Sequence, residues 1–118
     1  MTAPQLPIYI ESYRMTQEIF RCTVKFPREF KFLLGNALNE AAIGLCCQIS
    51  RATYAPQKEE VLDEILILLE KIKIQLRLCA DFKLLSCRQQ ASLGTMLEKT
   101  TSQAFAWARS ERRRQPVS

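Results

Sequence analysis

The sequence predicts an all-α protein, an antiparallel up-down-up-down four-helix bundle, and three observations support this prediction. Only three glycines and five prolines occur in 118 residues, and leucine, isoleucine, alanine, glutamate, lysine and arginine are abundant. Apolar residues recur at alternating steps of three and four, as they do on one face of an α-helix. Short loops join the predicted helices, which makes successive helices antiparallel neighbours. We expect residues 1–109 to form this single domain.

The first helix is expected over residues 7–25. Pro7 suits the first helical position, where its missing N–H is not needed, and the residue before Pro27 is driven out of the helical region. One flank of this helix has charged residues at three- and four-residue spacing, and the other flank has aromatic residues: Tyr9, Tyr13 and Phe20. The aromatic flank belongs either to a wide core stripe or to a second apolar face.

A second helix is expected over residues 28–52, because Pro27 can open it and Pro56 prevents it from continuing. Gly35 and Gly44 fall inside this helix, where each costs about 1 kcal/mol relative to alanine. We therefore expect another helix to pack closely against these small residues.

The third predicted helix, residues 58–80, has apolar side chains on two sides. One set forms a regular core stripe: Val61, Ile65, Leu68, Ile72, Leu76 and Cys79. At about 100° per residue a second set falls on nearly the opposite side: Ile67, Ile74 and Leu78. Either another subunit or a partner covers the second face, or this helix lies at the centre and the other three surround it. The pattern does not distinguish the two arrangements.

A fourth helix is expected over residues 87–109. Ser86 and Gln89 precede and open it with the S-x-x-Q pattern of a capping box. Residues 110–118 are expected to form a basic, disordered tail.

Composition excludes several kinds of chemistry. The chain has no histidine, which removes histidine bases and histidine metal ligands, and it has neither a glycine-rich phosphate loop nor a G-x-S-x-G motif. Its five cysteines contain no C-x-x-C pair, and three of them fall on or beside apolar helix positions, where we expect small, reduced core side chains: Cys22, Cys46 and Cys79. We expect a protein that is not an enzyme and needs no cofactor or metal.

Charge and hydropathy indicate the setting of the protein. No charged-then-apolar signal segment is present, and the apolar run 65–69 is far too short to span a bilayer, so we expect a soluble cytoplasmic protein without membrane contact. The net charge is +5, and four arginines and one glutamate in the last ten residues contribute +3 of it. The body therefore carries about +2, a balance that permits nucleic-acid binding.

Two segments are specific enough to indicate a family: FPREFKFLLG at residues 26–35 and LRLCADFKLLS at residues 76–86. Together with LPIYIESYRMTQEIFRCTVK, QISRAT, EILILLEKIKIQ and AFAW, they cover the chain from about Leu6 to Trp107. This pattern resembles the accessory variability determinant (Avd) proteins of diversity-generating retroelements. It is similar, more distantly, to the bundles encoded by intervening sequences in bacterial ribosomal RNA genes.

The resemblance implies a function. Avd proteins assemble into homopentameric barrels with a basic surface, bind the reverse transcriptase of the retroelement, and are thought to contact its template RNA or the cDNA. The enzyme copies a template repeat with errors at adenines, and the Avd subunit supports this mutagenic retrohoming without catalytic activity of its own. Two apolar faces fit such a ring, in which every subunit contacts two neighbours.

The same resemblance indicates which residues bind. Matching segments assign binding of RNA, DNA or the polymerase to Arg28, Lys31, Arg51 and Arg77, and the first helix adds Arg14, Arg21 and Lys25. The expected subunit interface comprises Tyr9, Tyr13, Phe20, Ile67, Ile74 and Leu78. Each arginine can instead pair with a nearby acid or complement a helix end. A structural oligomeric scaffold, and an RNA-associated bundle without a reverse-transcriptase partner, remain alternative functions.

Overall fold

The computed structural model describes residues 6–114, and this part of the chain consists of helices joined by short loops. The elements are α1 (Pro7–Thr23), α2 (Arg28–Phe30), η1 (Lys31–Gly35), α3 (Asn36–Tyr54), α4 (Glu59–Asp81) and α5 (Cys87–Arg114). Because α2, η1 and α3 follow one another without a break, they form one long helix. The all-α prediction is confirmed for the described residues.

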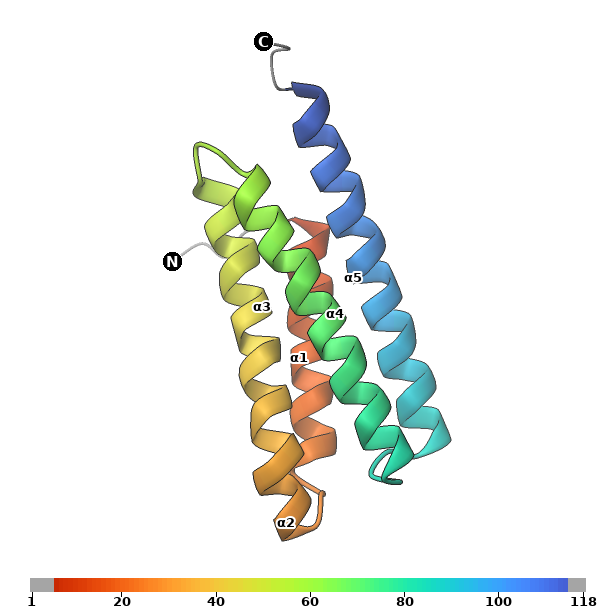
Figure 1. Cartoon of the computed structure of the whole chain (residues 1–118). Helices are drawn as coiled ribbons and strands as arrows, with labels where there is room; N and C mark the ends of the chain where they lie inside the picture. Colours follow the sequence, from red (N-terminus) through yellow and green to blue (C-terminus); the bar gives the residue numbers. More distant parts are fainter. Residues whose placement is uncertain (1–5, 115–118) are drawn as a thin grey trace.

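Four long helices lie side by side in a compact helical bundle that measures 53 × 30 × 22 Å (Figure 1). Helix α1 packs against α3 and α5, and α4 packs against the same two helices. Helices α1 and α4 therefore lie diagonally across the core. The alternative in which the third predicted helix is surrounded by the other three is wrong, because α4 keeps one side open to solvent.

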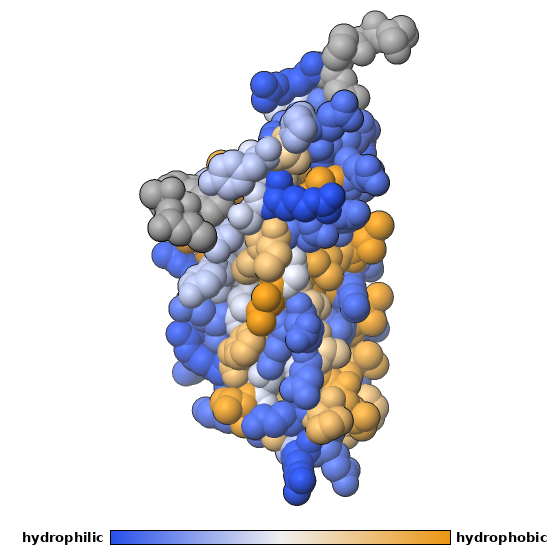
Figure 2. All heavy atoms as spheres, turned by 90° about the vertical axis from the view of Figure 1, so that its left-hand side faces the viewer, coloured by the Kyte–Doolittle hydropathy of each residue, from blue (hydrophilic) through white to orange (hydrophobic). Residues whose placement is uncertain are grey.

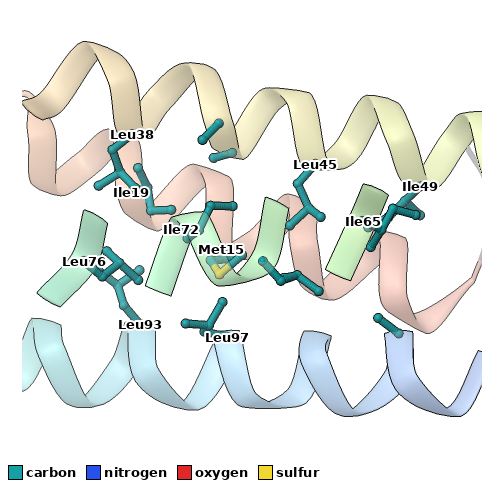
Figure 3. Close-up of a cluster of buried hydrophobic side chains, with 14 of the residues drawn as sticks. Met15, Ile19, Leu38, Leu45, Ile49, Ile65, Ile72, Leu76, Leu93 and Leu97 are labelled. Carbon is teal, nitrogen blue, oxygen red and sulfur yellow. The ribbon is translucent and has the colours of Figure 1, made fainter. Parts of the chain in front are cut away.

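All four long helices contribute to one hydrophobic core (Figure 3). Met15 of α1, Leu45 of α3 and Ile72 of α4 have no exposed surface, and Leu93 of α5 is 1% exposed. Burying one such side chain stabilises the fold by about 1.5–3 kcal/mol. The three- and four-residue spacing seen in the sequence is what brings these side chains to the inside.

Several helix ends follow the sequence signals. Helix α1 begins at Pro7, as predicted. The capping box is confirmed: the Ser86 N–H donates to Gln89 Oε1 at 2.9 Å, and the Gln89 N–H donates to Ser86 Oγ at 3.1 Å. Helix α1 ends at Thr23, two residues before the predicted end, because the chain tightens to three-residue hydrogen bonds ahead of Pro27.

The predicted basic tail requires a correction. Residues 110–114, expected to be disordered, are the last turn of α5, and residues 115–118 lie outside the described part of the chain. Arg114 Nη1 lies 3.8 Å from Glu111 Oε1, one turn earlier, and three arginines end the helix where its dipole favours positive charge. A basic run at a helix end therefore extended the helix and did not end it.

Lys58, which the sequence analysis did not single out, closes the end of α3. Its Nζ donates to the carbonyl oxygens of Ala52, Thr53 and Ala55 at 2.8, 3.1 and 2.8 Å. The last carbonyls of a helix have no partner within the helix, so this ammonium group satisfies them. The α3–α4 turn is thus fixed by a side chain and not only by Pro56.

One described helix, Arg28–Tyr54, is long and apolar enough to cross a membrane by length and composition alone. The core helix of a soluble protein meets the same criterion, and 39% of the apolar window is buried inside the bundle. A search for unbroken apolar runs, such as residues 65–69, does not detect Arg28–Tyr54. In this helix charged and polar residues interrupt the apolar ones. Cytoplasmic localisation stays a prediction.

Candidate nucleic-acid and subunit interfaces

Residues 25–33 form a basic and aromatic surface at one end of the bundle, the lower end in Figure 1. Lys25 lies in the turn before Pro27, and Arg28 and Lys31 lie in the first turns of the long helix, all three exposed. Phe32 follows, with 77% of its surface exposed. We call these residues, Lys25, Arg28, Lys31 and Phe32, the basic end.

A π-helical turn supports the basic end. In η1 the Asn36 N–H donates to the Lys31 carbonyl, a step of five residues where an α-helix has four. Such turns are frequent at functional sites. Gly35 lies at the end of this turn, where a methyl group would sit 3.5 Å from both Phe26 and Thr23. A methyl group at Gly44 would lie 3.8 Å from Leu68, so both glycines make ordinary contacts and neither is required by the close helix packing that the sequence predicted.

The seven predicted binding residues are all exposed but do not form one surface. Arg28 and Arg51 lie on the same long helix, about 35 Å apart at a rise of 1.5 Å per residue. Arg77 lies along a groove of about 700 Å³ between α4 and α5, close to the end of α4. Lys25, Arg28 and Lys31 lie together at one end of the bundle, and Arg21 and Arg77 lie near the same end, where α1 and α4 finish (Figure 1).

Ion pairs divide the set further. Arg21 Nη1 lies 3.1 Å from Glu18 Oε2, and Arg51 Nη1 lies 3.2 Å from Glu64 Oε2. Arg21 has the nearby partner that the sequence suggested, whereas Arg51, expected to complement a helix end, pairs with Glu64 of the next helix. Within the described residues no ion pair involves the other five: Arg14, Lys25, Arg28, Lys31 and Arg77.

The second apolar set of α4 faces solvent in the single chain. Ile67, Ile74 and Leu78 are 70%, 54% and 39% exposed. They lie at the outer edge of the side that faces α3, since Glu64 of the same helix accepts a hydrogen bond from Gln48. Leu33 is also exposed on the adjoining long helix. We call this surface, formed by Leu33, Ile67, Ile74 and Leu78, the α3–α4 face.

Figure 2 shows the two kinds of surface together. Hydrophobic residues form a vertical column along the right-hand edge of the view, on the side of the bundle where α4 lies. At the lower end, hydrophobic and hydrophilic residues lie next to one another. Several exposed apolar residues on one side of a small domain are typical of an interaction site.

The aromatic flank of α1 forms a second apolar surface, on the other side of α3. Tyr13 and Phe20 are exposed, Tyr9 is half-buried, and the Tyr9 and Tyr13 rings stack with centroids 6.3 Å apart. Burial raises the pKa of the Tyr9 hydroxyl, and so do the neighbouring Cys46, Tyr13 and Cys47, which places Tyr9 at the contact with α3. Together with exposed Ile43, these aromatic residues form the α1–α3 face. The alternative of a wide core stripe thus holds for Tyr9, which packs against the core, and not for Tyr13 and Phe20.

No protein-family model matches the chain, and no curated protein matches it either. Assignment to a family therefore depends on the sequence pattern alone.

The described residues contain no group of three or more cysteine, aspartate and glutamate side chains arranged to hold a metal ion. All five cysteines have free thiols, with Cys22 and Cys79 buried, Cys46 half-buried, and Cys47 and Cys87 exposed. The expected core position is confirmed for Cys22 and Cys79, whereas Cys46 is only half-buried.

Phe32 and Leu33 are among the exposed apolar residues that sequence reasoning missed, and they are more than 70% exposed. The buried stripe of the long helix passes through Phe30 and Leu34, and both are partly buried against the core. Phe32 and Leu33 fall between these positions, so helical periodicity already places them outside the stripe. Their position outside the buried stripe was the sequence signal that could have predicted their exposure.

Proposed function

We propose that this chain is a non-catalytic accessory protein of a diversity-generating retroelement. In this proposal it is an antiparallel four-helix bundle that assembles into a homopentameric barrel in the cytoplasm. It binds the reverse transcriptase and the template RNA or cDNA, and so supports mutagenic retrohoming. The sequence resemblance over Leu6–Trp107 supplies the family.

The basic end is the observation that supports this proposal most. Arg28 and Lys31 belong to the FPREFKF segment, which is the most specific part of the resemblance, and both side chains are exposed without an ion pair to the described residues. Exposed, unpaired cations are what phosphate binding requires. A ring of five subunits would multiply these charges fivefold and raise the local potential for a polyanion.

The two apolar faces support the proposed assembly. A ring needs two different complementary surfaces on each subunit, because a head-to-tail contact that closes joins one face to the other face of the neighbour. The α3–α4 face and the α1–α3 face lie on opposite sides of α3, and both are exposed in the single chain. They are available for two neighbours at once.

A double charge reversal tests the function. We expect Arg28→Glu combined with Lys31→Glu to lower affinity for labelled RNA by at least about tenfold and to weaken co-purification of the reverse transcriptase, because like charges repel the backbone. The matched control is Lys99→Glu with Arg109→Glu, which changes the net charge equally on exposed positions of α5. Circular dichroism should show unchanged helix content in both variants.

The possible outcomes separate the alternatives. Binding that survives the Arg28/Lys31 reversal at low salt would show that the assigned surface is wrong. RNA binding without any affinity for a reverse transcriptase would favour the RNA-associated bundle. Oligomers that bind neither would favour the structural scaffold. A reverse-transcriptase gene and a template–variable repeat pair beside the coding sequence would support the retroelement.

A further inference from the structure

Phe32 has a larger exposed fraction than any other large hydrophobic side chain in the described chain, at 77%. A phenylalanine stabilises a protein most when its ring is buried. A ring this open on an ordered helix is therefore available to contact another molecule. The neighbouring aromatic residue Phe30 behaves differently: its ring lies 5.3 Å from that of Phe82, and it packs against the core. Of the two aromatic residues Phe30 and Phe32, only Phe32 is therefore open, together with its neighbour Leu33 at 71% exposed.

Positive charge predominates near this ring, with three cations against one acid, Glu29, which stands three residues before Phe32. Arg28 stands four residues before Phe32 and three residues before Lys31. At both spacings side chains lie on the same side of a helix, so Arg28 is a neighbour of both. Lys25 lies in the turn that leads into the helix. Glu29 is the acid closest in sequence, and the described residues show no ion pair between it and any of these cations.

This combination discriminates between kinds of partner. An apolar protein surface would cover Phe32 but would remove the flanking cations from water without a counter-charge, which is unfavourable. A nucleic-acid duplex would satisfy the cations, but its bases are already stacked and offer no face to the ring. An unpaired base next to phosphates satisfies both features, because aromatic stacking tolerates any base and lysine or arginine follows the backbone.

We propose that the basic end binds single-stranded nucleic acid, with Phe32 stacking on an unpaired base and with Lys25, Arg28 and Lys31 contacting the adjacent phosphates. This inference rests on the proposed function, since it specifies the form of nucleic acid that the same surface takes. It adds a base-stacking residue and a preference for single strands.

The test measures fluorescence anisotropy of a labelled single-stranded RNA of mixed sequence, and of the corresponding duplex, with the full chain. We expect the single strand to bind more tightly than the duplex. Phe32→Leu, which keeps an apolar side chain but removes the aromatic face, should weaken single-strand binding by roughly fivefold to a hundredfold. Phe32→Tyr should retain most of the affinity, since it retains the ring.

Phe105→Leu is the matched control. Phe105 is 49% exposed on α5, away from the basic end, and its change should leave affinity unaltered. Light scattering and circular dichroism on every variant exclude an effect through assembly or folding. Lys25→Gln should lower affinity equally for all base compositions and reduce the salt dependence, as expected of a phosphate contact.

Four results would overturn the inference. Equal affinity of Phe32→Leu and the parent chain would remove the stacking role, and equal affinity for duplex and single strand would remove the preference, while the proposed function stands in both cases. If Phe32→Leu abolishes co-purification of the reverse transcriptase but not RNA binding, the ring contacts protein. If no nucleic acid binds at all, the inference fails, and the proposed function then depends on polymerase binding alone.

Discussion

Burial changes the acid–base chemistry of two cysteines in the core. Cys79 has no exposed surface, and burial, with a smaller contribution from neighbouring Cys22, raises the pKa of its thiol to about 11. Burial also raises the pKa of Cys22, a shift to which Glu18 adds and which Lys25 opposes. Since the thiolate is the reactive form, both side chains are inert near neutral pH.

The raised pKa predicts a loss of stability in alkali. The Cys79 thiol ionises near its ordinary value of 9.0 in the unfolded chain and near 11 in the folded protein. Between these values the unfolded state releases the proton first, so the free energy of unfolding should fall as pH rises through that window. Urea denaturation at several pH values measures this slope, at one protein concentration.

Two alanine variants isolate the effect of Cys79. Cys79→Ala should show a shallower fall in stability over the same pH window, whereas Cys87→Ala, at an exposed position, should keep the slope of the parent chain. The comparison uses slopes, because removing the buried sulfur also lowers stability at every pH. The same slope in all three proteins would contradict the assignment to Cys79.

At the scale of the helices, the end of α4 contains a strained position. Lys83 has φ 61°, in the left-handed region that suits glycine. The Leu84 N–H donates to the Cys79 carbonyl and the Lys83 N–H to the Ala80 carbonyl, both at 2.9 Å, which is the hydrogen-bond pattern of a Schellman motif. The turn to α5 therefore depends on a lysine in a conformation that costs about 1–2 kcal/mol for an L-residue.

Lys83→Gly should stabilise the protein. Glycine adopts this conformation without steric cost but gains freedom in the unfolded chain, so we expect a net increase of about 0.5–1 kcal/mol in the free energy of unfolding. Urea denaturation measures it. Lys83→Ala removes the same charge but retains the Cβ atom, and should bring no such gain. If both variants shift stability equally, the strain is not the cause.

Much of the helical architecture follows from the spacing of apolar residues and from the residues that start or stop helices. Proline and the Ser86–Gln89 capping box define helix starts by local chemistry, which a sequence displays directly. The end of α5 was mispredicted because a run such as SERRR suits both a solvated tail and a last helical turn. The i,i+3 ion pair of Arg114 with Glu111 and the buried Ala108 favour the helix, and burial depends on packing.

The candidate site was also predictable only in part, because local sequence signals show exposure but not contacts between helices. Exposure of Arg28 and Lys31 follows from the helical stripe. Pairing across helices does not: Arg51 meets Glu64, thirteen residues away on the next helix, only because the α3–α4 turn brings them together. The π-helical turn at Lys31–Gly35 has no sequence signature that periodicity detects.

At the scale of the whole molecule, apolar surface and charge are distributed unevenly. Both apolar faces flank α3, and the basic end lies at one end of the bundle. Helix α5 differs, since Phe105 is its one large hydrophobic side chain with substantial exposure in the described chain. In the proposed ring the α3 side of each subunit faces its neighbours, α5 faces outward, and the basic ends of all subunits gather at one end of the barrel.

The mass of the assembly tests this arrangement. Light scattering should give five times the 13.6 kDa mass of the chain at low and at high salt, because salt screens charges and does not weaken apolar contacts. Ile67→Glu with Ile74→Glu places two carboxylates where a neighbour would desolvate them, so this variant should be a folded monomer. Phe105→Glu on α5 should keep the parent mass. A double variant that still assembles would exclude the α3–α4 face from the interface, and a monomeric parent chain would remove the ring and leave the basic end to act alone.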